Sequence, residues 1–217
     1  GHDILAVACD VSDLDSCTKA VAEVQSKAGA VDVLVNNAGI TRDMTFKKMT
    51  KGDWDVVMKT NLDSVFNMTK QVMDGMMERG WGRVINVSSV NGQKGAFGQT
   101  NYSAAKAGMH GFTKALALEV AKKGVTVNTI SPGTIVTASF TEALHPFLDA
   151  DGLDSSDPVD VMTWIDNNFH QPADLGRAGV PDEIASITVY LASRRNGYVT
   201  GANVNVGIIY LLAVGSV

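Results

Sequence analysis

Residues 31–37 read Val-Asp-Val-Leu-Val-Asn-Asn, a short apolar run that ends at two amides. One similar run precedes it at Ile4–Ala8, and three follow at Arg83–Val87, Val125–Ile130 and Asn203–Val206. Short apolar runs without strict alternation, separated by helical segments, are typical of strands that are covered on both faces. The sequence therefore predicts a doubly wound α/β fold, in which helices cover a parallel sheet in three layers.

The helices between these strands are predicted from apolar spacing and from their end signals. We expect helices over Leu14–Ala28, from about Asp53 to Glu78, from about Tyr102 to Lys122, and over Pro181–Ser193. Glycine ends the two long helices, and proline opens the last one. In such sheets ligands bind beyond the carboxyl ends of the strands, so the loops that begin at positions 10, 36, 88 and 131 should converge on one cleft.

Length and composition limit the class of protein. A chain of 217 residues is sized for one domain, residues 1–217, and the loop-rich, aspartate-containing segment 138–175 is expected to be a substrate lid. The net charge of −5 leaves no basic surface for nucleic acid. Two cysteines and four scattered histidines predict no metal site and favour a reducing, cytoplasmic location. The apolar run 208–214 is far shorter than the roughly 20 residues of a membrane span.

Tyr102 and Lys106 are four residues apart at the start of a predicted helix, so their side chains share one face. A tyrosine titrates near pH 10 and needs a nearby cation to exchange protons at neutral pH. Lys106 can supply that charge. The spacing alone is common and carries little weight, since an exposed helix pair would look the same.

Other motifs surround this pair in a fixed order. Asn36-Asn37-Ala38-Gly39 ends one strand, Ser88-Ser89 and Pro132-Gly133 end two others, and Asn61 lies inside a long helix. Together with Tyr102-x-x-x-Lys106, this order resembles the short-chain dehydrogenase/reductase family. The resemblance implies a Rossmann-like fold, a nicotinamide cofactor, and oxidoreductase activity on an alcohol or ketone.

Within that resemblance, Tyr102 is the general acid and Lys106 tunes it while binding the nicotinamide ribose. Ser89 polarises the substrate carbonyl, and Asn61 completes a proton relay through water. Two alternatives stay open from the residues themselves. Ser88 could be mistaken for the catalytic Ser89 but is expected to satisfy local backbone groups, and Asn61 could be a buried amide that satisfies backbone groups.

The resemblance also implies cofactor contacts. Asp10 and Val11 correspond to the adenine-contacting turn, although Asp10 could simply cap the following helix. In the next loop, the small residues of Asn37-Ala38-Gly39 let the backbone approach the cofactor. A later segment is expected to cradle the nicotinamide, with Pro132, Gly133, Ile135 and Thr137. Tyr102 and Lys106 contact the cofactor as well.

From Asp32 to Ser131 the chain is most similar to acetoacetyl-CoA reductases, which use NADPH to make (R)-3-hydroxybutyryl-CoA for polyhydroxybutyrate synthesis. Asp43, Phe97 and Gln99 are then the expected substrate contacts. The alternatives are a 3-oxoacyl-acyl carrier protein reductase, a dehydrogenase of another alcohol, and a non-catalytic scaffold of the same fold. The resemblance further implies a homotetramer built through the last strand and the two long helices, with the apolar tail buried between subunits.

The chain also departs from the family pattern. No glycine-rich phosphate loop precedes Asp10, so we expect the first strand, helix and strand of the family to be missing from this sequence. That segment chooses between NADP and NAD, so NAD(H) stays open beside NADP(H). Ala96 and Thr134 replace a usual glutamine and tyrosine, which leaves the acyl group open.

Overall fold

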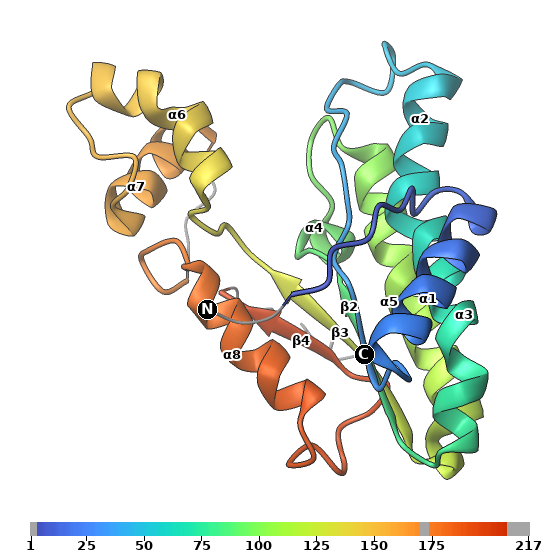
Figure 1. Ribbon diagram of the computed structural model, residues 1–217. Coiled ribbons are helices and arrows are strands. Elements are labelled where there is room, and N and C mark those ends of the chain that lie inside the picture. Colours follow the sequence, from blue (N-terminus) through green and yellow to red (C-terminus); the bar gives the residue numbers. More distant parts are fainter. Residues whose placement is uncertain (1–3, 170–173, 208–217) are drawn as a thin grey trace, which may run out of the picture. The chain divides into compact units, whose positions relative to one another are not determined.

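The computed structural model describes residues 4–169 and 174–207. Its sheet has four strands in the order β1 (Val33–Asn36), β2 (Gly82–Val87), β3 (Val125–Pro132) and β4 (Asn203–Val206) (Figure 1). Strand β2 pairs in parallel with both β1 and β3, and the register sets Asn36 opposite Asn86. The parallel sheet flanked by helices confirms the predicted fold class.

The helices differ in length and type. They are α1 (Leu14–Ala28), α2 (Lys51–Met58), α3 (Ser64–Glu78), α4 (Asn91–Lys94), α5 (Thr100–Val120), α6 (Ala138–Ala150), α7 (Pro158–Phe169) and α8 (Pro181–Ala192), with a π-helical turn at Lys59–Asp63 and a 3₁₀ turn at Ala121–Lys123. The chain divides into two compact units. One consists of the residues up to 131 with 188–204, and the other of residues 132–187 with those from 205 onward. A single domain over the whole chain stays a prediction.

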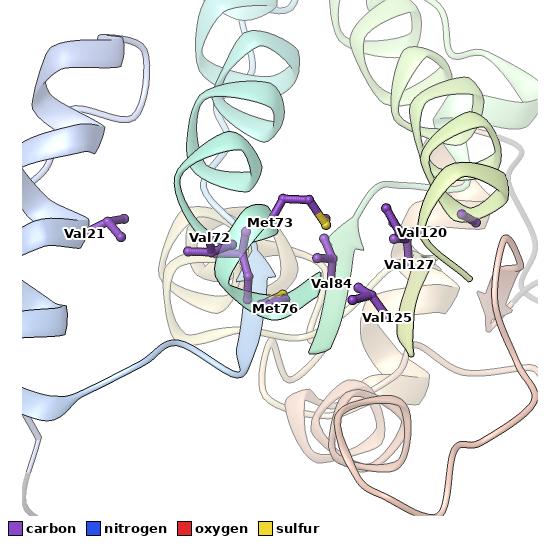
Figure 2. Close-up of a cluster of buried hydrophobic side chains, with 10 residues drawn as sticks. Val21, Val72, Met73, Met76, Val84, Val120, Val125 and Val127 are labelled. Carbon is purple, nitrogen blue, oxygen red and sulfur yellow. The ribbon is translucent and has the colours of Figure 1, made fainter. Parts of the chain in front are cut away.

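The core of the first unit lies between the sheet and helices α1, α3 and α5, which cover one face of β1, β2 and β3 (Figures 1 and 2). Met76 of α3 and Val84 of β2 are completely buried there, together with Val127 of β3. Burying one such side chain stabilises the fold by about 1.5–3 kcal/mol. The apolar runs that predicted the strands therefore also hold the helices against them.

The long helix predicted from Asp53 to Glu78 is interrupted. It begins at Lys51, where Thr50 and Asp53 form a reciprocal capping box, and it passes through the π-helical turn before α3 begins. Apolar periodicity does not report a single widened turn, which is why the sequence predicted one continuous helix. Helix α5 begins at Thr100, two residues before the predicted start.

Two strand predictions need correction. Residues Ile4–Ala8 do not form a strand, and the side chain of Ile4 is 84% exposed. An apolar run becomes a strand only when a neighbouring strand bonds to its backbone, and β1 is the last strand on this side of the described sheet. Strand β1 is also not covered on both faces, since Leu34 faces the core and is buried whereas Val35, on the opposite face, is 40% exposed.

In the second unit, the segment expected to be loop-rich contains helices α6 and α7. A separate apolar cluster joins them and includes Leu148, Val161 and Ile165. The aspartates that suggested a loop act at turns and helix starts instead. Asp157 accepts a bond from the backbone of Val159 at 2.7 Å as α7 begins. The lid function of this segment stays a prediction.

Among the described residues, the structure contains no helix that is both long and apolar enough to cross a bilayer. The apolar tail predicted to lie between subunits falls at 208–217, outside the described residues.

Candidate active site

Tyr102 and Lys106 project from the first two turns of α5 toward the end of β2. The Lys106 ammonium is 5.5 Å from the centre of the Tyr102 ring and donates to the carbonyl of Val87 at 2.7 Å. Tyr102 also shares a hydrogen bond with Ser89. The structure therefore brings Tyr102, Lys106 and Ser89 together, and Asn61 lies nearby, on the other side of the Gly39 backbone position next to Lys106.

The environment of these groups sets their protonation. Burial raises the pKa of Tyr102, the hydrogen bond with Ser89 partly opposes that rise, and the charge of Asp43 adds to it. Burial also lowers the pKa of Lys106 to about 8. At neutral pH the site thus holds a protonated phenol beside a cation, an arrangement suited to donating a proton to a substrate.

Ser88 and Ser89 are neighbours with different partners. The hydroxyl of Ser88 donates to the carbonyl of Lys106 at 2.8 Å, so it fastens the end of β2 to the second turn of α5. The hydroxyl of Ser89 accepts from the Asn91 amide at 3.1 Å and still reaches Tyr102. Sequence reasoning expected Ser88 to satisfy local backbone groups; its partner is a backbone carbonyl, but one that lies 18 residues away on α5.

Asn61 lies in the π-helical turn and is completely buried. Its Nδ2 donates to the carbonyls of Ile40 and Val57, both at 2.9 Å, and its Oδ1 accepts from the Ile40 amide at 3.2 Å. A Cβ on Gly39 would lie 2.5 Å from this Oδ1, which explains the glycine. The observed contacts are those of a buried amide that satisfies backbone groups, and the proton relay stays a prediction.

Several predicted cofactor residues gather at the end of β1. Val11, Asn37 and Ala38 line one small cavity of about 80 Å³. Asp10 lies beside them in sequence, but its carboxylate accepts from the backbone and hydroxyl of Ser12, which lowers its pKa. The cap of α1 is Asp13, so the alternative reading of Asp10 as the helix cap is wrong.

The predicted substrate residues lie on two loops that bond to each other. Gln99 donates to the Asp43 carboxylate at 2.8 Å and accepts from Asn91 at 2.9 Å. The backbones of Met44 and Gly98 are also joined, at 2.8 Å. Phe97 stands on the same loop with its side chain 92% exposed, free to meet a ligand.

The remaining predicted cofactor residues belong to the second unit. Gly133 donates its amide to Val206, and Ile135 forms a parallel bridge with Gly179. Pro132 is the last residue of β3. The hydroxyl of Thr137 accepts from the Phe140 amide and caps α6. These contacts fix the local backbone of the segment.

Sequence reasoning missed two sets of buried polar groups. Asn36 donates to Asn86 across β1 and β2, and Asn86 donates to Thr113 of α5, which also bonds Thr129 of β3. The second is Asn101, which is completely buried on the first turn of α5. The sequence did contain a signal for the first set. Asn36, Asn86 and Thr129 each lie near the end of an apolar strand, a position that favours a buried hydrogen-bond network between strands.

Comparison with known proteins agrees with this geometry. The family model described as short chain dehydrogenase matches residues 1–146. The acetoacetyl-CoA reductase of Cupriavidus necator is 54% identical over 203 residues, which cover 94% of this chain and 75% of that protein. The acetoacetyl-CoA reductase of Allochromatium vinosum is 52% identical, over 95% of this chain and 76% of that protein. The 3-oxoacyl-[acyl-carrier-protein] reductase of Vibrio harveyi is 43% identical, over 95% and 77%. The chain therefore belongs to the short-chain dehydrogenase/reductase family and is an oxidoreductase.

Proposed function

We propose that this enzyme reduces the ketone of a 3-oxoacyl thioester, with acetoacetyl-CoA as substrate, (R)-3-hydroxybutyryl-CoA as product and NADPH as reductant. The observation that carries the proposal is the placement of Tyr102, which is hydrogen-bonded to Ser89 and whose ring centre is 5.5 Å from the Lys106 ammonium. The names of the two reductases more than 50% identical to this chain support the substrate.

In the proposed reaction Ser89 and Tyr102 both bond the ketone oxygen of the substrate. NADPH supplies a hydride to the ketone carbon when it is bound. The carbonyl π pair moves to oxygen, which takes the proton from Oη of Tyr102, and the phenolate left behind is stabilised by the charge of Lys106. Because the pKa of Lys106 is about 8, this side chain is cationic in most molecules at neutral pH.

The residues present fit the ribose and adenine side of a nicotinamide dinucleotide. The small cavity beside Val11 and Ala38 is lined by apolar side chains together with Asn36, Asn37 and Ser64. Gly39 keeps a side chain away from the Lys106 ammonium, which a Cβ would approach to 3.5 Å. Lys106 uses one of its three N–H groups on Val87, so two remain for ribose hydroxyls. Asn61 would hold the backbone of Ile40 beside the same space, and the proposed water relay would use its remaining lone pair.

The substrate contacts of the proposal are Asp43, Phe97 and Gln99, with the segment 138–175 as the lid. Gln99 is oriented at both ends, by Asp43 and Asn91, so its amide presents a fixed pattern to the thioester. Exposed Phe97 offers an apolar face to the acyl chain.

A second candidate is reduction of the same group on an acyl carrier protein. The similarity to the Vibrio harveyi enzyme favours it. So do three exposed cations, Arg42, Lys47 and Lys48, on the substrate loop, which is the loop of residues 40–49 that carries Asp43. They could bind an acidic carrier protein or the phosphates of CoA. Rates with acetoacetyl-CoA and with an acetoacetyl carrier protein, compared before and after reversing these charges, separate the two.

The proposal includes a homotetramer in the cytoplasm. Its support is a groove of about 440 Å³ between α3 and α5 that includes Phe66, Met73 and Phe112, at the helices where the family resemblance puts the subunit interface. Light scattering of the full-length protein tests this, and a monomer that keeps full activity would exclude the tetramer as a requirement.

The test of the reaction is NADPH oxidation with acetoacetyl-CoA, run in parallel with NADH and with Tyr102→Phe. We expect turnover by the wild-type enzyme, a preference for NADPH, and a loss of about 10³-fold or more in Tyr102→Phe because the proton donor is removed. Equal rates in both enzymes would exclude Tyr102 as the acid. No turnover of any 3-oxoacyl thioester would refute the reductase proposal and favour the scaffold.

A further inference from the structure

Asn101 precedes Tyr102 on the first turn of α5 and is completely buried. Its Oδ1 accepts from the Tyr102 amide at 2.8 Å. The first N–H groups of a helix have no partner inside the helix, and Gln99, at the cap position, makes no capping bond with its side chain. Asn101 therefore satisfies the backbone of the proposed proton donor directly.

The other end of the same amide reaches two separate segments. Nδ2 donates to the carbonyl of Arg42 at 3.2 Å and to the carbonyl of Asp53 at 3.3 Å. Arg42 precedes Asp43 on the substrate loop, and Asp53 belongs to the first turn of α2. One side chain thus joins the backbone of Tyr102, the loop that carries Asp43, and α2.

This link has an electrostatic consequence for Tyr102. Asp43 is the charged side chain that raises the pKa of Tyr102, and Asp43 is held in turn by Gln99, two residues before Asn101. Exposed loops move more than the elements that they connect. Removal of the Asn101 side-chain amide would leave the carbonyls of Arg42 and Asp53 without this donor. The loop that carries Asp43 would then lose its direct link to α5.

We propose that Asn101 is a positioning residue that couples the substrate loop to the proton donor, so that Asp43 and Tyr102 hold one geometry around the thioester. This inference rests on the proposed function for its kinetic consequence. Asn101 has no exposed surface, so it acts through the Tyr102 backbone and through the carbonyl of Arg42, which precedes Asp43.

The experiment compares Asn101→Ala with Ser103→Ala in the full-length protein. Ser103 follows Tyr102 in the same helix, and its buried hydroxyl has no hydrogen-bond partner among residues 4–169 and 174–207, so it is a matched control. The measurements are kcat and KM for acetoacetyl-CoA, the dissociation constant of NADPH, and hydrogen exchange of peptides that cover residues 40–49 and 100–105.

We expect Asn101→Ala to lower kcat by about 10- to 100-fold, the usual cost of misplacing a reacting group by up to an ångström. KM for the thioester should rise, and the dissociation constant of NADPH should stay within about twofold because the contacts of Lys106 are kept. Both peptides should exchange faster than in wild type. Ser103→Ala should match wild type in every measurement.

A double-mutant cycle separates positioning from simple stabilisation. If Asn101 acts through the substrate loop, its effect on kcat/KM should shrink at least about threefold in an Asp43→Ala background, since residues that share one network are not additive. Additive losses, or a loss of NADPH affinity equal to the loss of kcat, would mean a purely structural role and would overturn the proposal.

Other outcomes are equally decisive. Exchange rates unchanged from wild type in Asn101→Ala would overturn the link itself, whatever the activity. If the wild-type enzyme does not turn over acetoacetyl-CoA, the proposed function fails while the exchange measurement still tests the link. If Asn101→Ala does not fold, Asn101→Asp keeps the acceptor for Tyr102 and disturbs the donors, and it should accelerate exchange chiefly in residues 40–49. If residues 40–49 exchange at the same rate in Asn101→Asp as in wild type, the proposed coupling between the substrate loop and Tyr102 is refuted.

Discussion

Replacement of Gly39 by alanine tests the packing of the site in the most direct way. The new Cβ would lie 2.5 Å from Oδ1 of Asn61 and 3.5 Å from Nζ of Lys106. The first of these distances is too short for a real contact, so the amide of Asn61 must move. That amide is held by Val57 in its own helix and by Ile40 in the loop after β1.

The expected cost follows from the bonds that this movement breaks. Two hydrogen bonds join Asn61 to Ile40, and each contributes about 1 kcal/mol, so the free energy of unfolding should fall by about 2 kcal/mol. For a chain of this size that lowers Tm by about 4–8 °C. The added methyl also occupies space beside the Lys106 ammonium, so the affinity for NADPH should fall about tenfold, the equivalent of one lost bond.

The assay is urea unfolding with and without NADPH, beside the control Gly111→Ala. Gly111 lies inside α5 with open space where its Cβ would be, so alanine there should raise stability by about 0.5–1 kcal/mol. If Gly39→Ala unfolds at the same urea concentration as wild type, while the control behaves as expected, the packing argument around Asn61 is wrong.

Three further predictions concern the same site. Ser88→Ala and Ser89→Ala should each cost about 1 kcal/mol of stability, because each removes a buried hydroxyl that bonds a backbone group. Ser88→Ala should keep kcat within a few fold, whereas Ser89→Ala should lose about 10²-fold or more, so turnover measured beside unfolding distinguishes them. Burial lowers the Lys106 pKa from 10.5 to about 8, so the unfolded chain binds the extra proton between those values. Wild-type stability should therefore rise with pH across that window by up to about 3 kcal/mol relative to Lys106→Met, and a pH-independent difference between the two would contradict it. Thr113→Val should lower the free energy of unfolding by about 1–3 kcal/mol, because it leaves buried partners on β2 and β3 unsatisfied, and denaturation at an unchanged midpoint would exclude that role.

The elements with strong local signals were predictable from the sequence. Helix α1 and strand β4 have their predicted bounds, because capping residues and short apolar runs mark both ends. The segment Ile4–Ala8 was not predictable in the same way. Whether an apolar run becomes a strand depends on a hydrogen-bonding neighbour, and the run itself carries no information about that neighbour.

The site divides along a similar line. The residue types at Ser89, Tyr102 and Lys106 are fixed by their chemistry, so a motif can find them, and the structure brings them together. The partners of Asn61 could not be predicted, because a buried amide serves a water or a backbone carbonyl equally well. Asn101 was missed for a related reason, since two of its three bonds reach segments 48 and 59 residues away and leave no local pattern.

The π-helical turn at Lys59–Asp63 limits how this segment can change in length. Each residue turns an α-helix by about 100°, so a residue added or removed here would rotate everything on one side of the turn by that amount. Helix α2 packs against α5, while α3 packs against α1, β1 and β2. A change in length at the turn would put one of these two faces out of phase with its partner. Substitutions are therefore tolerated in this stretch far more readily than insertions or deletions, and Asn61 keeps its position only while the number of residues between Thr50 and Ser64 is conserved.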